Sequence, residues 1–161
     1  MARNREHRYE VTVRWTGDTG RGTAGYRGYA RDHEVTVPGK PTLIPGSADP
    51  AFVGDPERWN PEELLVSSLS QCHMLSYLAV CSLSGVVVTG YQDVARGTMR
   101  ETGDGGGAFT EVVLNPVVTV AEEGMVEKAT ALHEKAHRIC FIASSVNFPV
   151  RHEPVVTAAG S

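Results

Sequence analysis

Hydrophobic and polar residues alternate along the first forty residues of the chain. The run from Tyr9 to Trp15 places an apolar side chain at every second position, which predicts a strand. A glycine-rich turn at 17–22 and a second alternating run from Tyr26 to Val37 complete a predicted antiparallel hairpin. Residues 38–59 are rich in proline, glycine, aspartate and serine. They predict a long irregular loop, and a loop of that length in a compact domain usually serves function or forms an interface.

The periodicity changes to that of a helix after this loop. Asn60 is a good N-cap, Pro61 suits the first helical position, and Glu63 completes a capping box. The helix is predicted to run from Pro61 to about Ser84, with Gly85 as its stop. Nearly all of its faces carry apolar or small residues, so we expect a central, buried helix.

The remaining residues predict more strands and one further helix. Two strands, Val86–Met99 and Phe109–Val120, are joined by a glycine-rich hairpin turn at 104–107. A helix from about Glu122 to Ile139 and a short strand from Val146 to Val156 follow. Hairpins segregated from helices predict the α+β class, in a single domain covering residues 1–161.

Composition and charge narrow the class of protein. The chain has 161 residues, of which 41% are hydrophobic and 21% charged, as in an ordinary globular protein. The net charge of -4 argues against a nucleic-acid partner. The polar start lacks the apolar stretch of a signal peptide, and no apolar run is expected to span a bilayer. We therefore expect a soluble cytoplasmic protein with no membrane partner.

The three cysteines are the first candidates for chemistry. An odd number in a chain of this size does not resemble a secreted disulfide scaffold. In a reducing compartment a thiol pair is catalytic, redox-sensing or metal-binding, while the simpler alternative is buried packing. Cys72 and Cys140 each lie on a predicted helical segment, far apart in sequence. Cys81 lies on another face of the Cys72 helix and is expected to pack in the core.

Cys72 becomes a nucleophile only as a thiolate, which requires a cation or hydrogen-bond donors nearby. His73 is the next residue, but one step along a helix points it about 100° away, so the activator must come from elsewhere. Glu62 lies roughly 15 Å from Cys72 along a straight helix. It could approach the Cys72 of a second copy packed antiparallel. Alternatively, Glu62 serves only the helix dipole from its first turn.

The segment His133-Glu134-Lys135-Ala136-His137 matches the H-E-x-x-H pattern of zinc metalloproteases. A metal face of His133, His137 and Cys140 is geometrically possible on one helix. The same helix must also bury an apolar stripe, which leaves the two histidines as ordinary flanking residues. A zinc protein is therefore a minor alternative.

The stretch Asn60-Pro61-Glu62-Glu63-Leu64-Leu65, followed by Cys72 and the distant Cys140, resembles the OsmC/Ohr family of thiol peroxidases. The segments from Glu62 to His73 and from Cys140 to Ala143 resemble the OsmC-like branch more than Ohr proper. The resemblance implies the OsmC-like fold, with antiparallel hairpins and sheets around a long central helix. It also implies an intertwined homodimer with two active sites at its interface.

By this resemblance Cys72 is the peroxidatic cysteine, Cys140 the resolving cysteine, and Glu62 the partner of an arginine. One branch of the family places that arginine about ten residues before the glutamate, where this chain has Phe52. Arg31 is the favoured candidate, because it shares a predicted strand face with Val35 and Val37 and so points toward the core. The other candidates are Arg58, Arg27 and Arg21.

The implied activity is an antioxidant one: reduction of organic hydroperoxides, with hydrogen peroxide as a poorer substrate. It proceeds through a Cys72 sulfenic acid and a Cys72–Cys140 disulfide, which an external dithiol reduces. No metal, flavin or haem is required. The main alternative is a non-catalytic dimeric module of the same fold that binds an apolar ligand at its interface.

Overall fold

The structure is a computed structural model, and it describes residues 5–160. Contacts divide the chain into two compact units, one ending at Leu64 and the other starting at Leu65. The prediction of a single domain over residues 1–161 stays a prediction.

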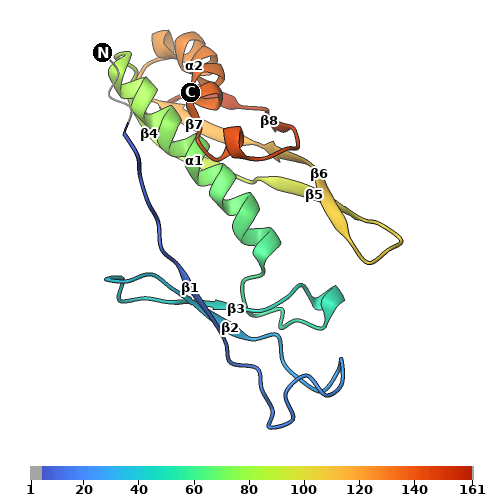
Figure 1. Cartoon of the computed structure of the whole chain (residues 1–161). Helices are drawn as coiled ribbons and strands as arrows, with labels where there is room; N and C mark the ends of the chain where they lie inside the picture. Colours follow the sequence, from blue (N-terminus) through green and yellow to red (C-terminus); the bar gives the residue numbers. More distant parts are fainter. Residues whose placement is uncertain (1–4, 161) are drawn as a thin grey trace. The chain divides into compact units, whose positions relative to one another are not determined.

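The first unit contains a small antiparallel sheet of order β1-β2-β3, drawn in blue and cyan in Figure 1. Its strands are β1 (Thr12–Trp15), β2 (His33–Thr36) and β3 (Ile44–Gly46). The predicted hairpin is confirmed at β1 and β2, but the second run is strand only over its last part. β3 was missed, because three residues are too few for alternation to register. As an edge strand it accommodates Pro45, which has no N–H to donate.

The connection between β1 and β2 is a folded loop. Gly17 lies against Ala30, where an added Cβ would be 1.9 Å from the Ala30 carbonyl oxygen. Ala30 N–H donates to the Gly17 carbonyl at 2.9 Å, and the Trp15 indole donates to the Ala30 carbonyl at 2.8 Å. Residues 17 and 30 are therefore fixed side by side, and Arg31 follows directly.

The predicted start of the central helix is confirmed. Glu63 N–H donates to the Asn60 side-chain oxygen at 2.8 Å, and Asn60 N–H donates to the Glu63 carboxylate at 3.2 Å. This reciprocal capping box satisfies two backbone donors that the helix itself leaves free. A short 3-10 helix, η1 (Pro50–Phe52), precedes it. The helix α1 runs from Pro61 to Leu83, close to the predicted range.

The second unit packs two helices with two three-stranded sheets, whose orders are β4-β7-β9 and β5-β6-β8. The elements after α1 are β4 (Val88–Asp93), β5 (Arg96–Glu101), β6 (Gly107–Leu114), β7 (Pro116–Val120), η2 (Glu123–Met125), α2 (Val126–Ile139), η3 (Ala143–Ser145), β8 (Val150–His152) and β9 (Val155–Ala158). β8 and β9 run parallel to β6 and β7, and the other pairs are antiparallel. The predicted α+β class is confirmed, with two α-helices and three small sheets within residues 5–160.

Each of the two long strands expected in this unit is broken in two. The break lies at one corner, where Asn115 N–H donates to the Asp93 carboxylate at 2.7 Å. The Asn115 amide also donates to the Val94 carbonyl at 3.0 Å. The two halves of each predicted strand thereby join different sheets. The single strand expected near the C-terminus is likewise two strands, β8 and β9.

The helix α1 buries one stripe, which consists of Leu69, His73, Tyr77, Val80 and Cys81. The expectation that almost all faces of α1 are buried is wrong within a single chain, since Leu75 is 62% exposed and Leu83 88% exposed.

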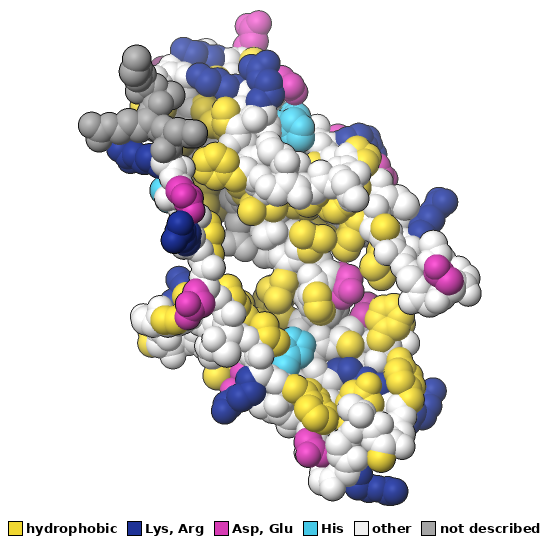
Figure 2. Space-filling view, viewed as in Figure 1, with side chains coloured by type: hydrophobic (Ala, Val, Ile, Leu, Met, Phe, Trp, Pro, Cys, Tyr) yellow, Lys and Arg dark blue, Asp and Glu magenta, His cyan; other side chains and the backbone are white. Residues whose placement is uncertain are grey.

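The helix α1 is also long and apolar enough to cross a membrane by length and composition, contrary to expectation. Core helices of soluble proteins share that profile. Figure 2 shows apolar side chains gathered at the surface of the protein.

Candidate active site

The second unit brings two of the three cysteines together. Cys72 lies halfway along α1, and Cys140 is the residue that caps the C-terminus of α2. Cys72 and Cys140 are both free thiols, and their side chains lie close enough for Cys72 to contribute to the raised pKa of Cys140. Cys140 is buried and Cys72 is half-buried. The fold therefore places a sheltered thiol against a more accessible one, as the two cysteines of a sulfenic-acid mechanism require.

The chemistry of Cys140 differs from that of an ordinary surface thiol. Burial, followed by its hydrogen bond to Cys72, raises the pKa of Cys140 to about 11. The Ala143 N–H donates to the Cys140 sulfur at 3.4 Å, which opposes this rise without cancelling it. Cys140 is therefore protonated near neutral pH.

An apolar hollow lies beside Cys72. Its volume is about 610 Å³, and its lining comes from α1 and from the segment after α2: Ser68, Gln71, Cys72, Leu75, Ser76, Ala79, Ile139 and Phe141. Phe141 is 80% exposed at its edge. An open hollow of this character suits an apolar molecule that carries one reactive polar group.

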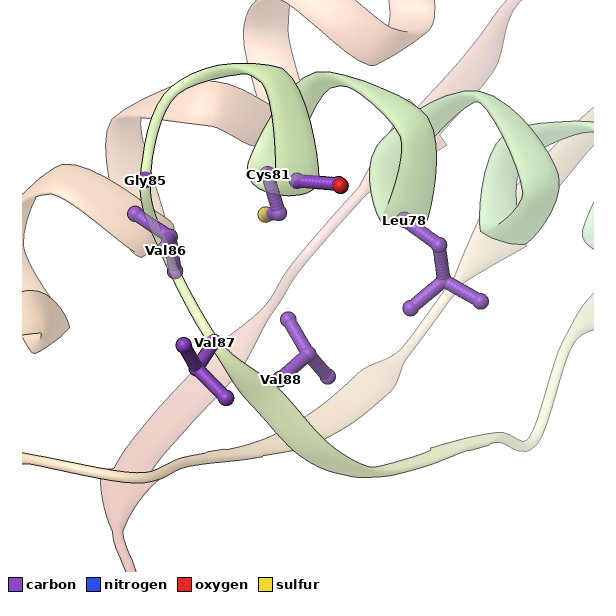
Figure 3. Close-up of a pocket in the computed structure, with 7 residues that line it drawn as sticks. Leu78, Cys81, Gly85, Val86, Val87 and Val88 are labelled. Atoms are coloured by element: carbon purple, nitrogen blue, oxygen red, sulfur yellow. The ribbon is translucent and has the colours of Figure 1, made fainter.

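Cys81 lies in a different place. It is 1% exposed within the core between α1, α2 and the β4-β7-β9 sheet, which confirms the expectation that it packs. It borders a separate pocket of about 330 Å³ formed where α1 ends and β4 begins (Figure 3). Burial raises the pKa of Cys81, so this thiol is a poor nucleophile.

The first unit holds a second candidate pocket, with a volume of about 210 Å³. Arg31 and Glu62 both line it. The other lining residues are His33, Ser47, Ala48, Asp49, Phe52 and Pro61. One carboxylate oxygen of Glu62, Oε2, is buried and has no hydrogen-bond partner among the described residues. A buried carboxylate oxygen without a donor is costly. It is therefore a place where a cation such as a guanidinium would bind favourably.

Arg31 is held by the loop before β2. Its guanidinium lies over the rings of Tyr26 and Tyr29, 4.5 Å and 4.0 Å from their centroids. It donates to both of their backbone carbonyls, at 2.6 Å to the Tyr29 oxygen. The expectation that Arg31 points from a strand into the core is wrong, because β2 begins only at His33. Among the described ion pairs none involves Arg31, so its charge remains available to an acidic group.

The other candidate arginines are placed differently. Arg58 lies 3.3 Å from the Asp32 carboxylate and 3.9 Å from that of Asp55. Its charge is thus already matched by two acidic groups. Arg21 and Arg27 are exposed, and neither lines the pocket that contains Glu62. This geometry favours Arg31 as the partner of Glu62.

The two histidines of the H-E-x-x-H segment do not form a metal face. His133 is buried against the ring of Tyr77, with centroids 3.8 Å apart, and hydrogen-bonds His73. Within residues 5–160 no group of three or more histidine, cysteine or acidic side chains is arranged to hold a metal ion. His73 points into this buried cluster, which agrees with the expectation that it does not activate Cys72.

Sequence reasoning missed this histidine cluster. His73 and His133 lie 60 positions apart, and His152, which lies beside both, is the last residue of β8. The spacing of residues along the chain does not indicate that positions so far apart will be in contact. The only available signal was the apolar setting of His73 on a helix that otherwise buries hydrocarbon.

The sequence matches the family model of the OsmC-like proteins over residues 54–154. The chain belongs to the OsmC-like family. The matched range includes Glu62, Cys72 and Cys140, and it leaves Arg31 outside. No protein of curated function matches the sequence.

Solved structures of this family have the same fold. An OsmC-like protein of unknown function from Vibrio cholerae shares 29% identity at a TM-score of 0.82, covering 93% of this chain and all of its own. An organic hydroperoxide resistance protein from Elizabethkingia anophelis shares 17% identity at a TM-score of 0.70, covering 96% of this chain and 99% of its own. A Legionella pneumophila organic hydroperoxide resistance protein, OsmC, shares 16% identity at a TM-score of 0.67, covering 94% and 99%. The family therefore includes proteins of hydroperoxide resistance as well as members without an assigned function.

Proposed function

We propose that this OsmC-like protein is a thiol-dependent peroxidase that reduces organic hydroperoxides, with hydrogen peroxide as a poorer substrate. Cys72 is the peroxidatic residue and Cys140 the resolving residue. The observation that carries the proposal is the contact between these two side chains, which lie 68 positions apart in sequence.

In the first step the Cys72 thiolate attacks the terminal oxygen of the hydroperoxide. An S–O bond forms and the O–O bond breaks. The alkoxide takes a proton and leaves as an alcohol, while the sulfur loses two electrons and becomes a sulfenic acid. In the second step the Cys140 sulfur attacks the Cys72 sulfur, so that an S–S bond forms and water leaves. An external dithiol then restores both thiols by exchange and is itself oxidised to a disulfide.

The different settings of the two thiols support this division of roles. The pKa of Cys140 is raised to about 11, so at neutral pH it is protonated and does not compete for the peroxide. It still lies against Cys72, where a sulfenic acid would form. Prompt disulfide formation protects a sulfenic acid from further oxidation.

The apolar hollow beside Cys72 supports the choice of substrate class. Its walls include Leu75, Ala79, Ile139 and Phe141, which can bind the hydrocarbon part of an organic hydroperoxide. Hydrogen peroxide has no such part and gains nothing from this surface. The hollow therefore favours organic substrates through binding rather than through a different reaction.

We assign to Arg31 and Glu62 the task of stabilising the thiolate, with Glu62 orienting the guanidinium by paired hydrogen bonds. Glu62 precedes Cys72 by ten positions on the continuous helix α1, a separation of roughly 15 Å. Glu62 therefore acts on the Cys72 of a second copy, in the homodimer that we propose. The apolar surface of α1, including Leu75 at 62% exposure, supplies a face for that partner.

The test is intact-mass analysis after one equivalent of an organic hydroperoxide such as cumene hydroperoxide. The wild-type protein should lose two hydrogens by forming a Cys72–Cys140 disulfide, and Cys72→Ser should not. Cys81→Ala is the matched control and should form the disulfide as wild type does. Consumption of hydroperoxide by Cys72→Ser at the wild-type rate would contradict the proposal. Absence of any reaction in the wild type, with an apolar ligand bound instead, would favour a binding module.

A further inference from the structure

The second unit contains a cluster of four histidines that the peroxidase reaction does not use. His73 comes from α1, His133 and His137 from α2, and His152 from β8. Ring centroids of neighbouring members lie 5.3 Å to 6.2 Å apart. The cluster thus joins three elements of the unit through their imidazoles.

Two of these histidines are fully inside the protein. His73 and His133 are each 1% exposed. Their rings lie nearly parallel, at 8°, and the His73 Nε2 and His133 Nδ1 atoms are 3.0 Å apart. Beyond this pair, the Tyr77 hydroxyl donates to the backbone carbonyl of Ala129 at 3.1 Å. The contact between α1 and α2 is therefore built from polar groups at its centre.

The hydrogen bond between His73 and His133 requires the accepting ring nitrogen to be unprotonated. A neutral imidazole has one N–H and one acceptor nitrogen, so one ring donates and the other accepts. Adding a proton to the accepting nitrogen would set two N–H groups against each other. The outer nitrogens, His73 Nδ1 and His133 Nε2, are buried without a partner among the described residues and so offer no help. A proton gained at the accepting nitrogen breaks the hydrogen bond, and one gained at an outer nitrogen buries a charge whose N–H has no partner.

Within residues 5–160, no acidic side chain compensates for such a proton at the pair. His152 from β8 disfavours a positive charge on either ring, and His137 from α2 disfavours one on His73. Glu134 is the acidic group of this cluster, lies 3.7 Å from His152, and is exposed. Tyr77 on α1 and Tyr91 on β4 have pKa values above the usual range because they are buried, so both phenols are uncharged.

These surroundings set the protonation of the pair. Burial first, and the charge of neighbouring histidines second, lower the pKa of His73 to about 4 and that of His133 to about 3. Burial also lowers the pKa of His152. His73 and His133 are therefore neutral at pH 7, and in the closed structure they stay neutral well below it.

The segments that carry the histidines also carry the thiols. His73 directly follows Cys72 on α1. Cys140 is the cap of α2, and its N–H donates to the carbonyl of His137 at 3.3 Å. A separation of α1 from α2 at the histidine pair would therefore move Cys140 away from Cys72.

We propose that His73, His133 and His152 are a pH-sensitive clamp: uncharged, they hold α2 against α1 and so keep Cys140 in contact with Cys72, and protonated in acid they release it. The clamp regulates the second step of the proposed peroxidase reaction. Its existence as a clamp is testable without that reaction.

The direction of the effect follows from proton linkage. When α1 and α2 separate, His73 and His133 reach water and regain ordinary pKa values near 6.5. The open state then binds more protons than the closed state, so acid favours opening. The clamp is fully closed above about pH 7, and it weakens as the pH falls through 6.5 toward 4. At pH 5 each histidine that gains a proton on opening favours the open state about 30-fold.

Amide hydrogen exchange with peptide-level mass analysis tests the clamp in the reduced protein. After correction for the intrinsic pH dependence, protection of the last turn of α2 and of Cys140 should fall at least about 30-fold between pH 7.5 and 5. In His133→Asn, an uncharged side chain replaces the ring, so one of the titrating groups is gone and the loss of protection between pH 7.5 and 5 should be about 30-fold smaller than in the wild type. His7→Asn is the matched control, since His7 is exposed and lies outside the cluster, and it should behave as wild type.

Two results would overturn the clamp. One is protection in the wild type that is unchanged between pH 7.5 and 5. The other is the same acid-induced loss of protection in His133→Asn as in the wild type. If His133→Asn does not fold, His152→Gln removes a neighbouring imidazole that lowers the pKa of both His73 and His133, and the midpoint of the transition should move to lower pH. An unmoved midpoint would count against the clamp. Failure of peroxidase activity alone would leave these exchange results unaffected.

Discussion

The Cys140 thiol lies against the Cys72 sulfur in the reduced protein, although one cysteine is in the middle of α1 and the other ends α2. The pair is thus poised for a disulfide before any oxidant arrives. Folding of the chain compensates for the conformational entropy that is lost when two thiols distant in sequence are brought together. The resolving step then needs only a small local movement.

Loss of the resolving thiol should separate the two chemical steps. Cys140→Ser is expected to consume about one equivalent of hydroperoxide per site, because the sulfenic acid forms without Cys140. Turnover with a dithiol should fall, and under excess peroxide the protein should gain mass by sulfinic or sulfonic acid formation at Cys72. Intact-mass analysis with peptide mapping measures both. Normal cycling by this variant would show that Cys140 is structural.

Substitution of Arg31 tests the pocket that contains Glu62. Arg31→Lys keeps the charge but loses the planar fork that can bind a carboxylate with two hydrogen bonds. Loss of one such charge-assisted bond should lower kcat/KM by about 10-fold to 100-fold. Steady-state kinetics with cumene hydroperoxide gives the value.

The control for that prediction is Arg58→Lys. Arg58 is occupied by Asp32 and Asp55, so a lysine in its place keeps an ion pair and should leave kcat/KM within about twofold. If Arg58→Lys is the more damaging of the two substitutions, the assignment of the arginine must be reversed.

The histidine pair also predicts the pH dependence of global stability. Both folded-state pKa values, about 4 for His73 and about 3 for His133, lie below that of an unfolded histidine. The unfolded chain therefore binds more protons, and the free energy of unfolding falls as the pH drops from 6.5 toward 4. Two groups give a slope of up to about 2.7 kcal/mol per pH unit. Urea denaturation from pH 7.5 to 4.5 measures it.

Other titrating groups act in a different window. Backbone hydrogen bonds lower the pKa of Asp18, and a hydrogen bond from Thr102 lowers that of Asp104, both from 3.8. The stabilisation that these two carboxylates provide is present above their ordinary pKa of 3.8 and is lost only at lower pH. A flat stability profile between pH 6.5 and 4.5 would therefore show that His73 and His133 do not titrate as the structure indicates.

The parts of the fold that were predictable from sequence depend on local chemistry. Asn60 and Glu63 lie three positions apart and form their capping box within one turn, so the start of α1 could be predicted. The strand break at Asn115 could not, because it depends on Asp93 and Val94, about twenty positions earlier. Alternation alone continues through such a corner without a sign of it.

The candidate site, too, could be predicted from the sequence only in part. Glu62, Cys72 and Cys140 were identified through a short motif and its spacing, and their roles remain predictions. The surroundings of Arg31 were predicted wrongly, because aromatic rings and carbonyls of its own loop, at Tyr26 and Tyr29, hold the guanidinium. Such a contact depends on the path of the backbone, and residue periodicity contains no information about it.

The final prediction is that Glu62 acts across a dimer interface. Along α1, Glu62 and Cys72 are separated by roughly 15 Å in one chain, too far for a shared site. We expect Cys72→Ser and Glu62→Ala homodimers both to be inactive. After subunit exchange in an equal mixture, about half of the dimers are hybrids with one intact site, which restores about a quarter of wild-type activity. If Glu62 instead served its own chain, the hybrids would have no intact site and mixing would restore nothing. Light scattering at micromolar concentration provides the independent check, and a monomer there would exclude the shared site altogether.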